Sequence, residues 1–427
     1  MKTKSSRPAR LLTACLFAAS ASAYAAAIFT PNNQPTGWVG EVAVTNFSFI
    51  SGLETIFKSD YIKAEWSGNL FAFPVDSDGT VLFDAERWSG GAQPGLDALT
   101  SATRRIVTMK DDGTKVPFLW GSLGTTQQQA IDNSKSAGTI GPNIVNYIRG
   151  DKTNEKPNGA LYRARAHTLG DIIHSRPLFV NHATDPRVYV GANDGMLHAF
   201  DADSGDEVFA YVPSFFIQPV AATSFSNIKA LIVDPYVHNY FVDASPNART
   251  VASQTVLVGG VGAGGKGLYA LDVTDPTAAT EAAAASKILW EITPTARKYN
   301  GTVTTSTDYA NLGHTYGVPV IAQLNDGTWA AIVGNGYNGG GTFQAVLYVI
   351  NLTTGAKIAA IPTTSPQAVS AGSPNGLSSP AAIDTNRDGK IDYVYAGDIN
   401  GNLWKFDLSS ASSGSWSATK LYTTSPA

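Results

Sequence analysis

Apolar residues along much of the chain alternate with polar ones, and the alternating runs are separated by turns rich in Gly, Asp and Asn. In the stretch YIKAEWSGNLFAFPVDSDGTVLF, which begins at Tyr61, two such runs flank a turn that ends at Gly68. Alternation with a period of two is typical of strands that bury one face, and short glycine turns join antiparallel strands. The pattern therefore predicts a protein built mainly of antiparallel hairpins.

The same pattern recurs along the chain. The stretch VYVGANDGMLHAFDADSGDEVFAYV, from Val188, matches the first one at the sequence Gly-x-Leu-x-Ala-Phe, and weaker copies begin at Thr255, Ala330 and Asp392. The leucines that align in the five copies are Leu70, Leu197, Leu268, Leu347 and Leu403. Because a single small sheet cannot bury both of its faces, such repeats are expected to pack on one another. We therefore predict an all-β fold, a β-propeller with about five visible blade units, with a β-sandwich as the alternative.

Prolines and insertions refine this prediction. Pro177, Pro319 and Pro380 each begin an apolar run shortly before a repeat, and proline is tolerated at the first position of a strand, so these runs are predicted to open a blade. The aligned leucines lie 56 to 127 residues apart, more than a compact blade of about 40 to 50 residues needs. Insertions are therefore expected, the longest with helical character at about 123–150, and ATEAAAASKILWEI predicts a second short helix.

The first residues of the chain have a different composition. MKTKSSRPAR carries four basic residues and is followed by the apolar run LLTACLFAASASAYAAA, which is typical of a secretory signal peptide. We predict a signal peptide at 1–25 and the propeller domain at 26–427, with a lipoprotein signal ending at Cys15 as the alternative. No later run of 18 or more apolar residues is present, so no integral membrane span is expected and the product is predicted to be exported.

Charge and cysteine content narrow the function classes. Removal of the basic N-terminal residues would leave 26 basic against 34 acidic residues, a formal net charge of −8. Such a chain lacks the basic surface that nucleic acids bind, so no nucleic-acid partner is expected. Its single cysteine, Cys15, lies in the segment predicted to be removed, so the exported chain would contain no disulfide.

The strongest chemical signal is the sequence DTNRDGKID, which begins at Asp384. Oxygen donors stand at loop positions 1, 3, 5 and 9, glycine stands at position 6, and position 7 can offer its backbone carbonyl, as in an EF-hand-like calcium loop. The predicted ligands are Asp384, Asn386, Asp388, the Lys390 carbonyl and Asp392. Position 12 holds Tyr395 in place of the usual glutamate, so Asp392 would have to close the shell. The alternative is an Asp- and Asn-rich turn between two strands.

Other motifs give weaker signals. The six histidines have no zinc-binding spacing and no Gly-x-Ser-x-Gly elbow is present, so the chain is predicted not to be an enzyme. His198 lies inside a strand of a repeat, where a structural hydrogen-bonding role is expected. Lone Asp-Gly pairs such as Asp112-Gly113 are too sparse to bind an ion and are predicted to be turns. The tripeptide RGD at 149–151 could imitate an integrin ligand, but a loop after a short helix is sufficient to explain it.

With these features placed, the chain resembles the propeller domain of PilY-type proteins, the calcium-binding biogenesis factors and adhesins associated with the tips of bacterial type IV pili. The resemblance rests on six segments that together span about residues 50 to 408. They are EWSGNLFAFPVDSDGTVLFDA, VNYIRGD, RARAHTLGDIIHSRPLFV, VYVGANDGMLHAFDADSG, GHTYGVPVIAQLNDGTWAAIVGNGYN and DTNRDGKIDYVYAGDINGNLWKFDL. LGDIIHSRP and the calcium loop are the most specific of them.

The resemblance implies an exported calcium-binding propeller that acts in pilus biogenesis and in pilus-mediated adhesion or motility. The five predicted ligands would hold Ca²⁺, and calcium occupancy would bias pilus extension against retraction. The implied partners are major or minor pilins and a host-surface receptor, and the implied location is the periplasm, the pilus tip or the cell surface. Members of this family commonly have a long N-terminal region and further C-terminal strands, so the chain is expected to be short at both ends and its propeller incomplete.

Two other classes are alternatives. Pyrroloquinoline-quinone dehydrogenases are exported, calcium-using propellers with a blade motif similar to GLYALDV, which begins here at Gly267. Many of them use a vicinal cysteine pair, and the chain predicted for export contains no cysteine. The second alternative is a non-enzymatic periplasmic scaffold propeller that uses its faces for protein contacts.

Overall fold

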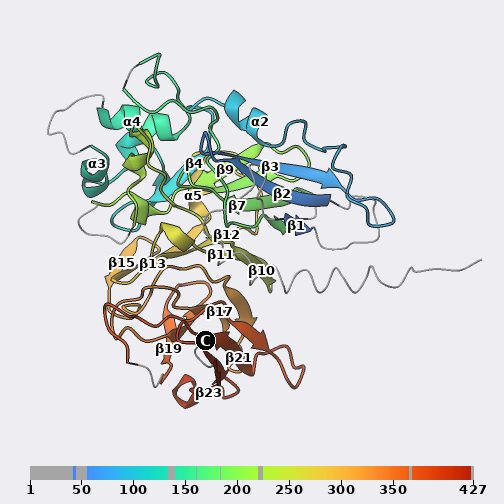
Figure 1. Ribbon diagram of the computed structural model, residues 1–427, viewed down its shortest axis with the longest axis vertical. Coiled ribbons are helices and arrows are strands. Elements are labelled where there is room, and N and C mark those ends of the chain that lie inside the picture. Colours follow the sequence, from blue (N-terminus) through green and yellow to red (C-terminus); the bar gives the residue numbers. More distant parts are fainter. Residues whose placement is uncertain are drawn as a thin grey trace, which may run out of the picture. The chain divides into compact units, whose positions relative to one another are not determined.

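The computed structural model describes residues 42–44, 55–132, 140–159, 161–182, 184–219, 225–364 and 368–424 (Figure 1). The signal peptide predicted at 1–25 lies outside these residues. The described part of the chain contains five sheets and only short helices, so the all-β prediction is confirmed. None of its helices is long and apolar enough to cross a membrane.

Each sheet is built mainly from strands that follow one another along the chain, and all neighbouring strands are antiparallel except the parallel pair β4 and β9. The first sheet contains β1 (Val42–Val44), β2 (Thr55–Ile62) and β3 (Ser67–Pro74). The second contains β4 (Ile106–Met109), β5 (Lys115–Pro117), β6 (Leu178–Val180), β7 (Arg187–Gly191), β8 (Leu197–Asp201) and β9 (Glu207–Tyr211). The third contains β10 (Asn247–Val251), β11 (Gln254–Gly260), β12 (Leu268–Asp272), β13 (Ile288–Thr293), β14 (Ala296–Tyr299) and β15 (Thr302–Thr305). The fourth and fifth contain β16 (Val320–Gln323), β17 (Trp329–Gly334), β18 (Val346–Asn351) and β19 (Lys357–Pro362), then β20 (Ala381–Ile383), β21 (Tyr393–Gly397), β22 (Asn402–Asp407) and β23 (Ser417–Thr423).

Consecutive sheets contact one another through corresponding strands. β1 contacts β6, β6 contacts β10, β10 contacts β16, and β16 contacts β20. Each contact joins one sheet to the next sheet along the chain, which is how the blades of a propeller follow one another. The β-propeller prediction is therefore confirmed, with five blade-like sheets in the described residues. The three prolines predicted to open a blade directly precede β6, β16 and β20.

Four apolar clusters lie between successive sheets. Side chains of strand β11 contribute to two of these clusters. Val256 and Val258 pack with the fourth sheet, whereas Leu257 between them packs with the second sheet. Successive side chains of a strand point to opposite faces, so the alternation found in the sequence supplies two interfaces at once.

The five aligned leucines all lie in the third strand of the repeated unit. Four of them, Leu70, Leu197, Leu268 and Leu347, are buried in the cluster that their sheet shares with the following sheet. Leu403 of β22 is 40% exposed, because no further sheet follows in the part of the chain that the structure describes. Its neighbour Trp404 points to the opposite face and is buried against the fourth sheet.

Helices and added strands occupy the connections between blades. The helices are α2 (Gln93–Ala98), α3 (Thr125–Ile131), α4 (Ile140–Ile148) and α5 (Glu281–Ser286). The segment expected to have helical character at about 123–150 contains α3 and α4, which contact one another (Figure 1). Sequence reasoning missed β4, β5, β14 and β15, because these strands extend a blade at its edge and do not repeat the blade pattern.

In two places a tryptophan packs over a glycine turn of the following sheet: Trp88 from the segment between β3 and α2, and Trp290 from β13. The Trp88 indole donates to the Ala202 carbonyl at 3.2 Å in the β8–β9 turn, and the Trp290 indole donates to the Leu352 carbonyl at 2.9 Å in the β18–β19 turn. In the second case, Gly355 has φ +67°, and a Cβ there would lie 2.7 Å from the Trp290 ring. The turn glycine is therefore required both for its backbone conformation and for the close approach of the ring.

Replacement of this glycine should destabilise the fold. Gly355→Ala is expected to lower the free energy of unfolding by about 2–5 kcal/mol, because it combines a left-handed backbone with a clash against a buried ring. The matched control is Gly327→Ala in the same sheet, where φ is +88° and no atom lies within 4 Å of the added Cβ. The control should lose only about 1 kcal/mol. Denaturant unfolding of the two variants measures the difference, and equal losses would contradict the role assigned to Trp290.

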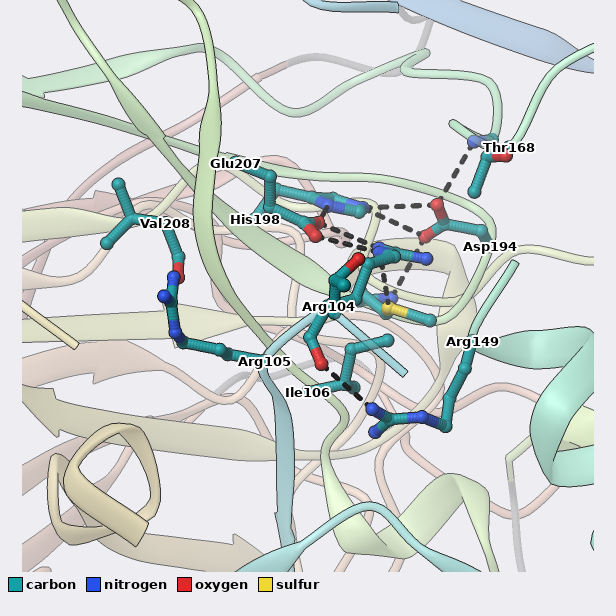
Figure 2. A network of polar contacts seen from close by, with 12 residues as sticks. Arg104, Arg105, Ile106, Arg149, Thr168, Asp194, His198, Glu207 and Val208 are labelled. Carbon is teal, nitrogen blue, oxygen red and sulfur yellow. Dashed lines mark hydrogen bonds and ion pairs between the residues drawn. The ribbon is translucent and has the colours of Figure 1, made fainter. Parts of the chain in front are cut away.

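A buried charged network attaches the segment before β4 to the second sheet (Figure 2). The Arg104 guanidinium donates two hydrogen bonds of 2.7 Å to the Glu207 carboxylate. His198 of β8 lies between two carboxylates, with Nδ1 2.8 Å from Glu207 and Nε2 3.1 Å from Asp194. When all four groups are ionised their charges balance, which offsets the cost of removing them from water.

The charges in this network shift the pKa values of its members and so determine their protonation states. Burial alone would lower the pKa of His198, but Asp194 and Glu207 outweigh burial and raise the pKa to about 9. Burial would raise the pKa of Glu207, but Arg104 and His198 outweigh burial and lower the pKa to about 2. Arg149 extends the network, because its guanidinium donates to the Arg104 carbonyl at 2.8 Å (Figure 2). His198 therefore has the structural hydrogen-bonding role that its position in a strand predicted.

The network predicts how stability depends on pH. With an unfolded pKa of 6.5, the contribution of His198 is fully present below pH 6.5 and is lost as the pH rises through about 9. The contribution of Glu207 is present above its unfolded pKa of 4.5 and is lost as the pH falls through about 2. Melting temperatures from calorimetry should therefore be highest between pH 4.5 and 6.5 and fall toward pH 9. His198→Gln should melt lower at pH 6 and show a smaller alkaline fall, and an equal alkaline fall in both proteins would contradict this assignment.

Candidate metal centre

The loop predicted to bind calcium connects β20 to β21. Its early donors, Asn386 and Asp388, are exposed, whereas Ile391 and Asp392 at its end are buried. The loop therefore exposes its second and third oxygen donors to solvent and anchors its last donor in the fold.

The Asp384 carboxylate caps the loop from its first position. Its Oδ1 accepts a hydrogen bond from the Arg387 N–H at 2.6 Å, and its Oδ2 accepts one from the Gly389 N–H at 2.8 Å. Gly389 has φ +88°, which a residue with a side chain rarely adopts. The glycine at position 6 thus permits the sharp turn that brings its amide back to the first carboxylate.

The next two donors close smaller turns. Asn386 Oδ1 accepts from the Asp388 N–H at 2.9 Å, and Asp388 Oδ1 accepts from the Lys390 N–H at 2.9 Å. Each of these side chains bonds the backbone two residues further on, as Asn and Asp do in Asx-turns. The alternating oxygen donors therefore hold the loop backbone themselves.

Asp392 is the buried donor of the loop. Its Oδ2 accepts hydrogen bonds from the Thr385 hydroxyl and from the Thr385 N–H, the latter at 2.8 Å. These bonds lower the pKa of the Asp392 carboxyl, so the group is an anion at neutral pH. Thr385 was not singled out from the sequence, since a hydroxyl that holds a ligand carboxylate has no spacing signature of its own.

The chemistry of the donor set fits a calcium ion, which prefers several hard oxygen ligands. The loop supplies three carboxylates, one amide oxygen and the Lys390 carbonyl. Across the described residues, however, no three His, Cys, Asp or Glu side chains are gathered as metal ligands. In this loop each carboxylate instead accepts hydrogen bonds from the backbone, so calcium binding would require the carboxylates to turn toward a shared ion.

The segment LGDIIHSRP forms a second polar cluster. Asp171 Oδ2 accepts from the Asn193 amide at 2.7 Å and lies 2.8 Å from His238 Nε2. His174 Nδ1 lies 2.7 Å from Asp243 Oδ2. Burial raises the pKa of the Asp243 carboxyl, and the hydrogen bond with His174 offsets this only in part. Sequence reasoning gave these residues no role, because their partners lie some 22 to 69 positions away in the chain.

Beside this cluster lies a small recess lined by Arg163, Arg165, His167, Asp171 and Asp194, among others. Its volume is about 20 Å³, which is room for roughly one water molecule. The arrangement therefore fits a structural polar cluster and not a pocket for an organic ligand.

The RGD tripeptide at 149–151 is not displayed as an adhesive motif. The Arg149 residue is only 2% exposed, and its guanidinium donates to the carbonyls of Ser101 and Phe118 and to the Glu281 carboxylate. A receptor could not reach this side chain in the folded protein. The loop explanation for the tripeptide is the one that the structure supports.

Comparison with known proteins identifies the family. A family model described as PilY1 beta-propeller domain matches residues 168–420. The type IV pilus biogenesis factor PilY1 of Pseudomonas aeruginosa (strain PAK) is 37% identical in an alignment of 404 positions that covers 86% of this chain and 31% of the relative. A type IV pilus biogenesis factor PilY1 homolog of Xylella fastidiosa is 32% identical in an alignment of 457 positions that covers 91% of this chain and 29% of the relative.

Among solved structures, the crystal structure of the Pseudomonas aeruginosa PilY1 C-terminal domain is 40% identical, covers 53% of this chain and 39% of that chain, and has a TM-score of 0.40. The chain spans about a third of the length of the curated relatives it matches. The family match includes both the LGDIIHSRP segment and the loop at 384–392. Since the family model covers more than half of the chain and relatives over 30% identical match most of it, the chain belongs to the PilY1 β-propeller family.

Proposed function

We propose that this chain is a calcium-binding propeller that acts in type IV pilus biogenesis. The pilus part is supported by membership of the PilY1 β-propeller family, whose relatives are named type IV pilus biogenesis factors. The calcium part is carried by one observation, the loop at 384–392 with hard oxygen donors at every second position of its first half and a buried, ionised aspartate at its end.

The ion would act by neutralising charge and ordering the chain. Asp384, Asp388 and Asp392 place three carboxylates within nine residues, and calcium would remove the repulsion between them. An ion that binds only the folded loop stabilises it by RT ln(1 + [Ca]/Kd), about 2.7 kcal/mol at a hundredfold excess over Kd. Calcium would therefore fix the connection between β20 and β21.

We also propose that the chain is exported to the periplasm, pilus tip or cell surface and acts by binding, not by catalysis. Its partners would be pilins, and calcium occupancy would bias pilus extension against retraction. Adhesion to a host-surface receptor would use surfaces other than Arg149, which is buried.

Loss of one charged ligand should remove calcium binding. Asp384→Ala or Asp388→Ala is expected to weaken the affinity at least about tenfold, because each removes a carboxylate from the donor set. Calorimetric titration of calcium into the purified chain measures the affinity. The matched control is Asp112→Ala in a lone Asp-Gly turn, where Asp112 Oδ1 caps the Thr114 N–H at 2.8 Å. The control should bind like the wild type, and unchanged affinity in both loop variants would mean that the loop is only a turn.

The pilus role is tested separately in cells. A strain that lacks the gene should lose surface pili, and the wild-type gene or the Asp112→Ala gene should restore them. The Asp384→Ala gene should restore pili but change the balance of extension and retraction, measured as twitching motility. Normal piliation without the gene would remove the pilus part of the proposal and leave the calcium part standing.

A further inference from the structure

The calcium loop is bonded to the fourth sheet as well as to its own sheet. The Ile391 N–H donates to the Gln323 carbonyl at the end of β16 at 2.9 Å, and Lys390 pairs with Gln323 in a parallel bridge. The Ile391 residue is buried in the apolar cluster that also contains Ala322 and Leu324. The end of the loop therefore lies against the neighbouring sheet through both polar and apolar contacts.

Asn325, in the β16–β17 turn, links three segments of the chain. Its Nδ2 donates to the Ile391 carbonyl at 2.8 Å and to the Leu408 carbonyl, just after β22, at 3.1 Å. Its own backbone carbonyl accepts a hydrogen bond from Lys390 Nζ at 3.2 Å. One asparagine thus joins the fourth sheet to the calcium loop and to the end of a strand in the fifth sheet.

These hydrogen bonds hold a residue that lies between two of the predicted ligands. Ile391 is position 8, between the carbonyl donor Lys390 at position 7 and the carboxylate donor Asp392 at position 9. Both backbone groups of Ile391 are held by the fourth sheet, the N–H by Gln323 and the carbonyl by Asn325. The orientation of the donors on either side is therefore set by a neighbouring sheet, in the way that outer contacts orient the ligands of a metal.

We propose that Asn325 is a positioning residue of the calcium loop, and that calcium occupancy in turn fixes the joint between the fourth and fifth sheets. The inference rests on the proposed calcium site. Coupling between two equilibria is reciprocal, so a joint that orders the loop for calcium is itself ordered when calcium binds. Calcium would then act on the packing of two blades and not only on one connection.

The first test is the calcium affinity of Asn325→Ala. This variant removes both side-chain donors but keeps every oxygen donor of the loop and the backbone carbonyl that Lys390 uses. Calorimetric titration should show calcium binding about 5- to 20-fold weaker than in the wild type, the loss expected for two hydrogen bonds. The matched control is Asn351→Ala in the same sheet, where Asn351 caps the β18–β19 turn by accepting from the Thr353 and Thr354 N–H groups. The control should bind calcium like the wild type even if it melts at a lower temperature.

A second variant separates positioning from electrostatics. Asn325→Asp has nearly the same shape but offers no donor to the Ile391 and Leu408 carbonyls, and it adds a negative charge near the loop. Simple attraction of the cation would tighten calcium binding, whereas loss of positioning would weaken it. We expect weaker binding, and tighter binding in Asn325→Asp would overturn the proposal.

Hydrogen exchange supplies a readout that is independent of affinity. In the wild type, calcium should slow exchange of the Ile391 and Leu408 amides and of the β16–β17 turn, and in Asn325→Ala at saturating calcium the turn should no longer respond. If the wild type binds calcium and Asn325→Ala binds it equally well, the coupling is wrong and the calcium site stands. If the wild type does not bind calcium, the calcium part of the proposed function fails and this inference fails with it, whereas the pilus part stands.

Discussion

Apolar contact between successive sheets is the interaction on which the rest of this fold depends, because a sheet of a few strands exposes two faces and can bury neither of them alone. In β11 the side chains of Val256 and Val258 pack with one neighbouring sheet, and Leu257 packs with the other. In the described residues, each of the three inner sheets is therefore stabilised by the sheet before it and the sheet after it. The packing of Trp290 of the third sheet over the turn at Gly355 of the fourth is one such contact between neighbouring sheets.

Polar contacts add two features to this apolar packing, and both depend on the composition of the solution. The network of Arg104, Glu207, His198 and Asp194 is enclosed and charge-balanced, so the proton concentration controls it through His198. The loop at 384–392 is open to solvent at its second and third donors, so a dissolved cation can reach it. The two features differ because burial excludes ions but leaves protonation equilibria in place.

The sequence predicted the features that repeat and missed those that do not. Alternation and the aligned leucines placed five blades, because one repeated packing rule governs each sheet; Leu403 occupies the same strand position as the other four leucines but is 40% exposed, since no further sheet packs on it in the described residues. The added strands β14 and β15 follow no such rule, and neither do the long-range pairs of Asp171 with His238 and of His174 with Asp243. The predicted donor positions of the loop follow from local spacing, whereas its hydrogen bond with Asn325 forms only when the fold brings two sheets together.

The position of the loop determines how far the effect of a bound cation can extend. A loop joined to the fold only at its two ends would confine the effect of the ion to its own residues. Here the Asp392 N–H donates to the Ile383 carbonyl of β20, and the Asp392 carbonyl accepts from the Leu408 N–H at 2.8 Å. The same Leu408 accepts from Asn325 of the fourth sheet, so Asp392, which would close the proposed ion site, is two hydrogen bonds away from a neighbouring blade. If calcium binds as proposed, a modest binding energy at the surface would bias the packing of sheets, since the groups that would bind the ion and the groups that join the sheets share the same short stretch of backbone.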